Sequence, residues 1–155
     1  MQMLIVKNKP HHFSAYTLIE TLIVLTLTLF FFLFPIIAFT SWKNDLSAYQ
    51  FFIQFERRIY AVQKSAIVHQ KNTSFSYVQE KNYLLFQAPS YSSMMWQVLP
   101  IPDGITVEQD GIITFKAETG NESSLKKYTF YWTRKKQRIS YQFQMGSGRY
   151  LKKIE

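Results

Sequence analysis

Residues 21–42 read Thr21-Leu-Ile-Val-Leu-Thr-Leu-Thr-Leu-Phe-Phe-Phe-Leu-Phe-Pro-Ile-Ile-Ala-Phe-Thr-Ser-Trp42, and no charged residue interrupts them. A helix needs about 20 mainly apolar residues to cross a bilayer, so this run of 22 residues is long enough. Trp42 and Lys43 end the run with an aromatic residue and a cation, which is usual at a membrane boundary. Pro35 removes one backbone donor and predicts a local kink. The sequence therefore predicts a transmembrane helix over 16–42.

Two simpler interpretations of this run are a cleaved secretory signal and a plain signal anchor. A secretory signal has an apolar stretch of about 7–15 residues, followed by small residues at its cleavage site. Here the stretch is longer and ends in Phe39-Thr-Ser-Trp42, a poor cleavage site. Lys7 and Lys9 precede it, so the positive-inside rule places the N-terminus in the cytoplasm. We expect a single-pass protein of the cell membrane with an extracytoplasmic head over 43–155.

The composition excludes several classes of site. The 155 residues hold 18 Lys and Arg against 10 Asp and Glu, and no cysteine. A disulfide framework, a Cys-ligated zinc site and a cysteine nucleophile are therefore absent. The three histidines are His11, His12 and His69, and no phosphate loop or paired-carboxylate motif accompanies them. We expect no catalytic residue, no metal site and no cofactor.

Glu20 places a carboxylate at the mouth of the apolar run. A carboxylate near hydrocarbon is costly and usually has a partner. No cationic residue lies within one helical turn of it, so the partner must come from another chain or from a distant part of this one. The alternative is that Glu20 is solvated in the headgroup layer.

The residues around Glu20 read Ser14-Ala15-Tyr16-Thr17-Leu18-Ile19-Glu20-Thr21-Leu22-Ile23-Val24-Leu25, and this stretch resembles the class III signal of type IV pilins and pseudopilins. In that family a basic leader ends in a small residue, usually Gly, and is followed by an aromatic residue, Thr-Leu-Ile-Glu and an apolar stretch. The resemblance implies that residues 1–15 are a leader, which prepilin peptidase cuts between Ala15 and Tyr16 before N-methylating Tyr16. It also implies that Glu20 pairs with the N-terminal amine of a neighbouring subunit during filament assembly. Ala15 in place of Gly and Tyr16 in place of the usual Phe depart from the pattern.

Three further segments narrow the resemblance: Phe51-Phe-Ile-Gln-Phe-Glu56, Ala61-Val-Gln-Lys-Ser-Ala66-Ile-Val-His69 and Met145-Gly-Ser-Gly-Arg-Tyr150. They are similar to the minor pseudopilins of Gram-positive competence systems, and most similar to the D-type subunit. This likeness implies a minor pseudopilin of a DNA-uptake machine that acts in transformation, at the cell membrane before assembly and at the cell surface, in a pseudopilus, afterwards. The implied partners are prepilin peptidase, other major and minor pseudopilins, membrane lipid and, indirectly, an assembly ATPase and a polytopic platform protein. The alternatives are a minor pilin of a type II secretion or adhesion pilus system and a DNA-binding tip subunit that uses a basic C-terminal hairpin.

Residues 43–70 show the periodicity of an amphipathic helix. No Gly or Pro occurs between Pro35 and Pro89, so we predict one helix from about Thr17 to His69, kinked near Pro35. The apolar stripe consists of Phe52, Phe55, Ile59, Val62 and Ala66, and we expect it to be widened by Leu46, Tyr49, Ile53, Tyr60 and Ile67. The residues expected to face away are Glu56, Arg57, Gln63 and Lys64.

After residue 70 the apolar period changes to two, which is typical of strands. We predict three hairpins: 74–78 with 83–87, 105–108 with 112–116 around Asp110-Gly111, and 127–133 with 139–143. Residues 88–104 contain three prolines and are predicted to be a loop, and residues 145–148 a turn after the last strand. The resulting fold class is α+β and pilin-like: one long N-terminal helix packed on an antiparallel β-sheet head, the sheet covering about 74–145.

The segment 126–153 holds nine Lys and Arg residues and no Asp or Glu, with aromatic residues interleaved. Such a segment suits contacts to the DNA backbone and stacking on single strands, and the candidate contacts are Arg134, Lys135, Lys136 and Arg138. The alternative is that the aromatic residues line the sheet core, while the cations lie on an exposed turn and discourage aggregation of an edge strand. We favour this alternative and keep DNA as a candidate partner.

Overall fold

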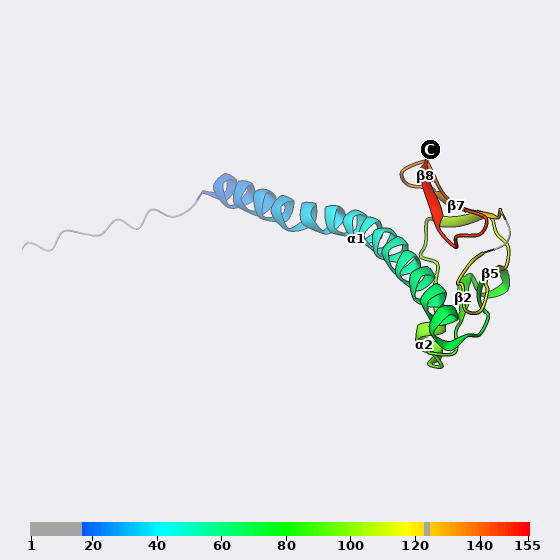
Figure 1. The fold of residues 1–155 in the computed structure, drawn as a ribbon. Helices are drawn as coiled ribbons and strands as arrows, with labels where there is room; N and C mark the ends of the chain where they lie inside the picture. Colours follow the sequence, from blue (N-terminus) through cyan, green and yellow to red (C-terminus); the bar gives the residue numbers. More distant parts are fainter. Residues whose placement is uncertain (1–16, 123–124) are drawn as a thin grey trace, which may run out of the picture. The chain divides into compact units, whose positions relative to one another are not determined.

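The computed structural model describes residues 17–122 and 125–155, except for the side chains of residues 34–41 within the long helix. The elements are α1 (Leu18–His69), β1 (Thr73–Val78), the 3-10 helix η1 (Gln79–Lys81), β2 (Tyr83–Gln87), α2 (Met94–Gln97), β3 (Val98–Pro100), β4 (Ile105–Gln109), β5 (Ile113–Phe115), β6 (Lys127–Trp132), β7 (Gln137–Phe143) and β8 (Tyr150–Ile154) (Figure 1). The chain divides into two units, residues 1–40 and residues 41–155, and α1 contributes to both. The α+β class with antiparallel strands is confirmed.

The prediction of one uninterrupted helix is confirmed, because α1 continues for 52 residues. It ends without glycine: Gln70 adopts a left-handed φ of 52°, as residues just past a helix terminus often do. Two carbonyls of its final turns also accept hydrogen bonds from the head: Thr73 Oγ1 donates to Val62 O at 2.9 Å and the Glu118 amide donates to Ala66 O at 3.3 Å. The expected kink stays a prediction, because Pro35 is one of residues 34–41, whose side chains lie outside the described part of the structure.

The head contains two four-stranded antiparallel sheets, where the sequence predicted one. The first sheet has the strand order β3-β2-β1-β5 and the second β4-β6-β7-β8. The predicted hairpins β1–β2 and β6–β7 are both confirmed, with Phe75 opposite Phe86 in the first and Phe130 opposite Ile139 in the second.

The predicted hairpin over 105–116 is wrong. Strand β4 pairs with β6 and β5 pairs with β1, so the Asp110-Gly111 segment connects the two sheets. The local turn signal is overridden by burial, because pairing with β1 places Ile113 and Phe115 of β5 fully inside the core.

Two further segments differ from expectation. Residues 88–104, predicted to be a loop, contain α2 and β3, and β3 adds to β2 with Leu99 opposite Leu84. Residues 145–148, predicted to follow the last strand, instead connect β7 to β8. In both cases the added strand is short, and its apolar residues are too few to show a period in the sequence.

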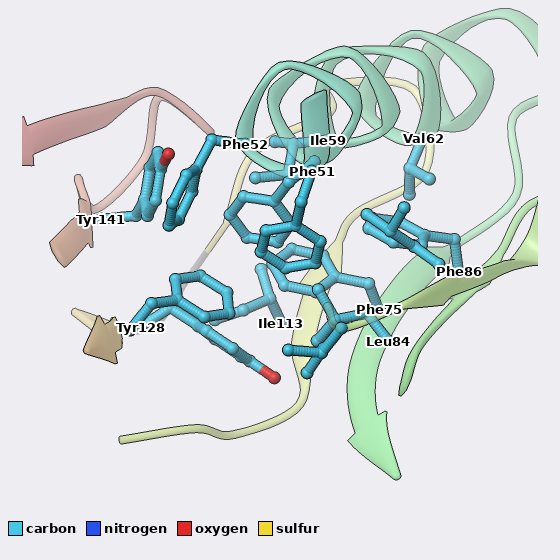
Figure 2. Close-up of a cluster of buried hydrophobic side chains, with 14 of the residues drawn as sticks. Phe51, Phe52, Ile59, Val62, Phe75, Leu84, Phe86, Ile113, Tyr128 and Tyr141 are labelled. Atoms are coloured by element: carbon cyan, nitrogen blue, oxygen red, sulfur yellow. The ribbon is translucent and has the colours of Figure 1, made fainter. Parts of the chain in front are cut away.

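The core lies between α1 and the strands and is unusually aromatic, as Figure 2 shows. The predicted stripe on α1 is confirmed, and every member of it is buried: Phe52, Phe55, Ile59, Val62 and Ala66. Its partners come from both sheets, and the fully buried aromatic residues among them are Phe75, Phe86, Phe115, Tyr128, Phe130, Tyr141 and Phe143.

The predicted width of the stripe is wrong. The residues expected to widen it are all exposed, by 38% to 66%: Leu46, Tyr49, Ile53, Tyr60 and Ile67. The helix instead widens its buried face on the other side, with Ala48 and Phe51. Glu56 and Gln63 were expected to face away, but both side chains contact the head. A period of 3.6 residues defines a stripe, but the shape of the partner surface decides which flank is covered.

Candidate functional site

Glu20, the residue that the sequence analysis singled out for assembly, lies in the first turn of α1, and its side chain is exposed. Its amide is directed to Thr17, whose carbonyl accepts at 3.0 Å and whose hydroxyl accepts at 3.4 Å. Thr17-x-x-Glu20 therefore has the spacing of a capping box, and a carboxylate here also interacts favourably with the helix dipole. Helix capping is a local reason for this residue pair, and it leaves the carboxylate accessible to a partner.

The α1 segment 18–33 exposes its large apolar side chains on every side. Each is between 52% and 82% exposed: Leu18, Ile19, Leu22, Ile23, Val24, Leu25, Leu27, Leu29, Phe30, Phe31, Phe32 and Leu33. The hydroxyls of Thr21, Thr26 and Thr28 donate to backbone carbonyls three or four residues earlier, at 2.7 to 2.8 Å, so they need no outside partner. Among the described residues, no helix is both long and apolar enough to cross a membrane.

The other residues of the predicted processing site cannot be placed. The leader 1–15, the cleavage position between Ala15 and Tyr16, and the methylation position Tyr16 lie outside the described residues.

Of the four cations of the candidate DNA contact, Arg134, Lys135 and Lys136 lie in the β6–β7 turn and Arg138 lies at the start of β7. Three of the four have side-chain partners within the chain. Arg134 Nε is 3.4 Å from the carboxylate of Asp45, and Arg138 Nε donates to Glu108 at 2.8 Å. Lys135 donates to the Tyr49 hydroxyl, and its ammonium lies 4.4 Å and 4.5 Å from the ring centres of Tyr49 and Trp132.

Lys136 differs from its neighbours. Its side chain is exposed, it has a left-handed φ of 53°, and no other side chain within the described residues pairs with it. The turn therefore docks on α1 through Arg134 and Lys135 and on β4 through Arg138. These contacts favour a structural role for most of the cluster.

We expect Lys135→Ala to lower the free energy of unfolding by about 1 kcal/mol, because it removes a cation held over two rings. Lys136→Ala, one residue away, should change it by less than about 0.5 kcal/mol. Urea unfolding followed by tryptophan fluorescence measures both. If the turn also contacts DNA, Lys136→Ala weakens DNA binding at low salt without loss of stability, and equal effects of both variants on stability would contradict the assigned contacts.

A partly buried polar network that the sequence did not predict joins α1 to β7 and β8. Glu56 Oε1 accepts from the Tyr141 hydroxyl at 2.9 Å and from Lys152 Nζ at 2.7 Å. Burial and then the negative charge of Glu56 raise the pKa of Tyr141 far above its ordinary value. The same two causes raise the pKa of Tyr150, whose ring lies edge-to-face with that of Tyr141. No periodicity could identify this network, because its members are 85 and 96 residues apart in the chain.

Two glycines and one glutamine form a second junction that the sequence did not predict. Gln63 Nε2 donates to Gly120 O at 3.1 Å and lies 3.5 Å from Ser147 O. Gly148, with φ +61°, is so close that a Cβ there would lie 2.2 Å from Gly120 O and 2.4 Å from Gln63 Nε2. This junction connects α1 to the loops before β6 and β8. The feature of the sequence that could have indicated it was the glycine pair at 146 and 148.

Tyr128 is buried, and no hydrogen-bond partner for its hydroxyl lies within the described residues. Burial raises the pKa of Tyr128 far above its ordinary value, with smaller contributions from Asp110 and Tyr77. In the unfolded chain a tyrosine loses its proton near pH 10. Above about pH 10 the unfolded state therefore binds fewer protons than the folded state, and stability falls as the pH rises.

We expect Tyr128→Phe to leave the free energy of unfolding at pH 7 unchanged or raise it by up to about 1 kcal/mol, because an unsatisfied buried hydroxyl is removed. Its loss of stability between about pH 10 and 11.5 should be smaller than that of the parent chain. Tyr141→Phe is the matched control: it should show a similar change of slope but lose about 1 kcal/mol at pH 7, because its hydrogen bond to Glu56 is lost. Unfolding curves across this pH range test both, and an unchanged alkaline slope in Tyr128→Phe would contradict the assignment.

His69 lies exposed at the last residue of α1. Within 17–122 and 125–155, no three His, Asp or Glu side chains are grouped to hold a metal ion. Comparisons of the chain with protein-family models, with curated proteins and with solved structures gave no match.

Proposed function

We propose that the chain is a pilin-like assembly subunit, a minor pseudopilin of a competence DNA-uptake machine, which is inserted in the membrane and then assembled into, or primes, a pseudopilus. The observation that carries the proposal is the division of α1. Apart from Glu20, the side chains of residues 18–33 are either apolar or threonines whose hydroxyls bond to the helix backbone. The stripe from Phe52 to Ala66, by contrast, is buried in the head. A helix that is apolar all round needs an apolar environment, either lipid or the helices of other subunits.

Glu20 gives this segment a specific role in assembly. A carboxylate surrounded by apolar groups is costly unless a cation offsets its desolvation. Cleavage after Ala15 would create an ammonium at Tyr16, four residues before Glu20. Pairing of Glu20 with the ammonium of a neighbouring subunit favours one axial register between adjacent helices. The capping geometry at Thr17 leaves the Glu20 carboxylate exposed for that pairing.

The head would then be presented outside the membrane by the same helix that anchors it. Its partners in this proposal are prepilin peptidase, other pseudopilins and, indirectly, the assembly ATPase and its membrane platform. The proposal assigns no catalytic activity to this chain. The head has 16 basic and nine acidic residues over 43–155, and this excess of positive charge is compatible with a nucleic-acid cargo. Three of the basic residues, Arg134, Arg138 and Lys152, are paired with carboxylates of the chain.

We expect Glu20→Ala to be cleaved normally but to enter sheared filaments at least tenfold less than the parent chain, because the register-setting pair is lost. Glu80→Ala, which removes an exposed carboxylate from η1 in the head, is the control and should enter normally. N-terminal sequencing of the membrane fraction reads cleavage, and immunoblotting of the sheared fraction reads incorporation.

An intact Met1 in cells that process other prepilins would overturn the pseudopilin proposal itself. Normal incorporation of Glu20→Ala after normal cleavage would overturn only the role of Glu20. A minor pilin of a secretion or adhesion system is the second candidate, and loss of transformation without loss of secretion or adhesion in a deletion strain distinguishes the two.

A further inference from the structure

The turn between β6 and β7 lies on α1 close to the point where that helix enters the head. Arg134 Nε is 3.4 Å from the Asp45 carboxylate, and Lys135 donates to the Tyr49 hydroxyl. Asp45 and Tyr49 follow Trp42 by three and seven residues, a spacing that places all three on one face of a helix. At a rise of about 1.5 Å per residue, Asp45 lies about 4.5 Å and Tyr49 about 10 Å beyond Trp42 along the axis.

Trp42 marks the membrane boundary in the function proposed above, and the present inference rests on that insertion. Trp42 belongs with the head to the unit of residues 41–155, and its side chain is 60% exposed. Tryptophan prefers the interface between hydrocarbon and water. Lipid headgroups extend about 5–8 Å beyond the hydrocarbon, so the level of Asp45 lies within the headgroup layer and that of Tyr49 just outside it. The turn therefore lies within one Debye length, about 8 Å, of the lipid phosphates.

The charges at this end of the head are mainly positive. Lys43 lies at the boundary, and the turn adds Arg134, Lys135 and Lys136. Arg134 is paired with Asp45, and the Lys135 ammonium is held over two aromatic rings. Lys43 and Lys136 are exposed and form no ion pair within the residues that the structure describes. Both are therefore able to bind anions, and Lys136 is carried by a turn that its neighbours hold in place.

Asp103 adds a second carboxylate to this end. It belongs to the β3–β4 turn, which lies beside the β6–β7 turn because the Thr133 amide donates to Gly104 O at 2.9 Å. The four cations, less Asp45 and Asp103, leave two positive charges in excess. Each Lys or Arg near an anionic membrane surface contributes about 1 kcal/mol of attraction. An anionic lipid surface is therefore favoured over a zwitterionic one.

A lipid surface also fits this end better than a nucleic acid does. Binding to the DNA backbone gains affinity from each phosphate that a Lys or Arg neutralises, and two of the four cations here already have partners in the chain. A lipid layer, by contrast, brings its phosphates to the level of the turn as soon as α1 is inserted. The contact then costs little further orientational freedom.

We propose that, before assembly, this end of the head binds the anionic headgroups of the membrane that holds α1. Lys43 and Lys136 contact lipid phosphates, and Arg134 and Lys135 hold the turn at the level of those phosphates. The headgroups in turn hold the head against the bilayer surface. Extraction of the subunit into a filament breaks these contacts, so membrane lipid is a partner of the head as well as of the apolar segment.

Acetylation of lysine side chains in the full chain tests the proposal, because only the unprotonated amine reacts. The chain is inserted into nanodiscs of phosphatidylcholine, alone or with phosphatidylglycerol as one lipid in three, and mass spectrometry measures the rate at each lysine. We expect phosphatidylglycerol to slow the reaction of Lys136 by at least about threefold, since a surface potential of about −30 mV favours the ammonium by that factor. Salt at about 1 M, where the Debye length is about 3 Å, should abolish the difference.

Lys116 is the matched control, because it is also exposed but lies at the other end of the head helix. Two residues later, the Glu118 amide donates to Ala66 O, about 36 Å beyond Trp42 along α1. This distance is several Debye lengths, so the reaction rate of Lys116 should be the same in both bilayers.

Equal rates for Lys136 in the two bilayers, or equal slowing of Lys136 and Lys116, would overturn the proposal. So would a greater slowing of Lys136 by a short DNA duplex than by phosphatidylglycerol, a result that would assign the turn to nucleic acid. A chain that does not enter the phosphatidylcholine nanodiscs would overturn this proposal together with the membrane insertion on which it rests, so the two failures are distinguishable.

Discussion

Phe55→Ala is expected to lower the free energy of unfolding of the head by about 3–5 kcal/mol, the range for large aromatic truncations in a core. Phe55 is fully buried, and its ring lies between 5.0 Å and 6.3 Å, centre to centre, from six other aromatic rings. Those rings belong to α1 and to strands of both sheets, so the cavity would open where the helix joins the two sheets. Since domains of this size are stable by about 5–15 kcal/mol, the variant should be close to unfolding.

The matched control for Phe55→Ala is Tyr60→Ala, which removes a ring of similar size from the same helix. Tyr60 is 66% exposed, and we expect a loss of less than about 1 kcal/mol. Urea unfolding of the purified chain in detergent, followed by tryptophan fluorescence, gives both values. Similar losses in the two variants would mean that Phe55 does not occupy the centre of the core.

Gly148→Ala is expected to cost about 2–4 kcal/mol, from two separate causes. Its φ of +61° disfavours any residue with a Cβ, at about 1 kcal/mol. The new Cβ would also lie 2.2 Å from the Gly120 carbonyl oxygen, a backbone atom that cannot move alone, and crowding of this kind typically costs about 1–3 kcal/mol.

Gly146→Ala separates these two causes. Gly146 also has a positive φ, +75°, but a Cβ there would meet nothing within 4 Å. Its expected cost is therefore about 1 kcal/mol, from the backbone alone. The difference between the two variants, measured by the same urea unfolding, reports the steric contact at the junction of α1 with the loops before β6 and β8. Equal costs would show that Gly148 is not in contact with Gly120 and Gln63.

The correct predictions concern features that are encoded locally. The absence of Gly and Pro between Pro35 and Pro89 predicted a continuous α1, and the spacing of its stripe correctly predicted five of the side chains that it buries. The β1–β2 and β6–β7 hairpins were predictable because each pairs neighbouring segments of matching period. The predicted start of the helix, at about Thr17, is likewise a local feature, and α1 begins at Leu18.

The wrong predictions concern pairings between distant segments. Strand β5 pairs with β1 and not with β4, its neighbour in the sequence. Ile113 and Phe115 are fully buried in this pairing, which a separate β4–β5 hairpin would not achieve. The contacts of the basic turn were not predictable from the sequence either, because Arg134 and Lys135 contact Asp45 and Tyr49, which lie more than 80 residues earlier.

By itself, the sequence determined the apolar segment, the single long helix, its buried stripe and the alternation of short strands, because each depends on residues within a few turns or one hairpin of one another. Only the tertiary structure decided that the strands form two sheets, that Glu56 and Gln63 point into the head, and that the β6–β7 turn docks on α1. Those features depend on which surfaces are buried together. Which surfaces meet is a property of the whole packed head, and no local pattern encodes that choice.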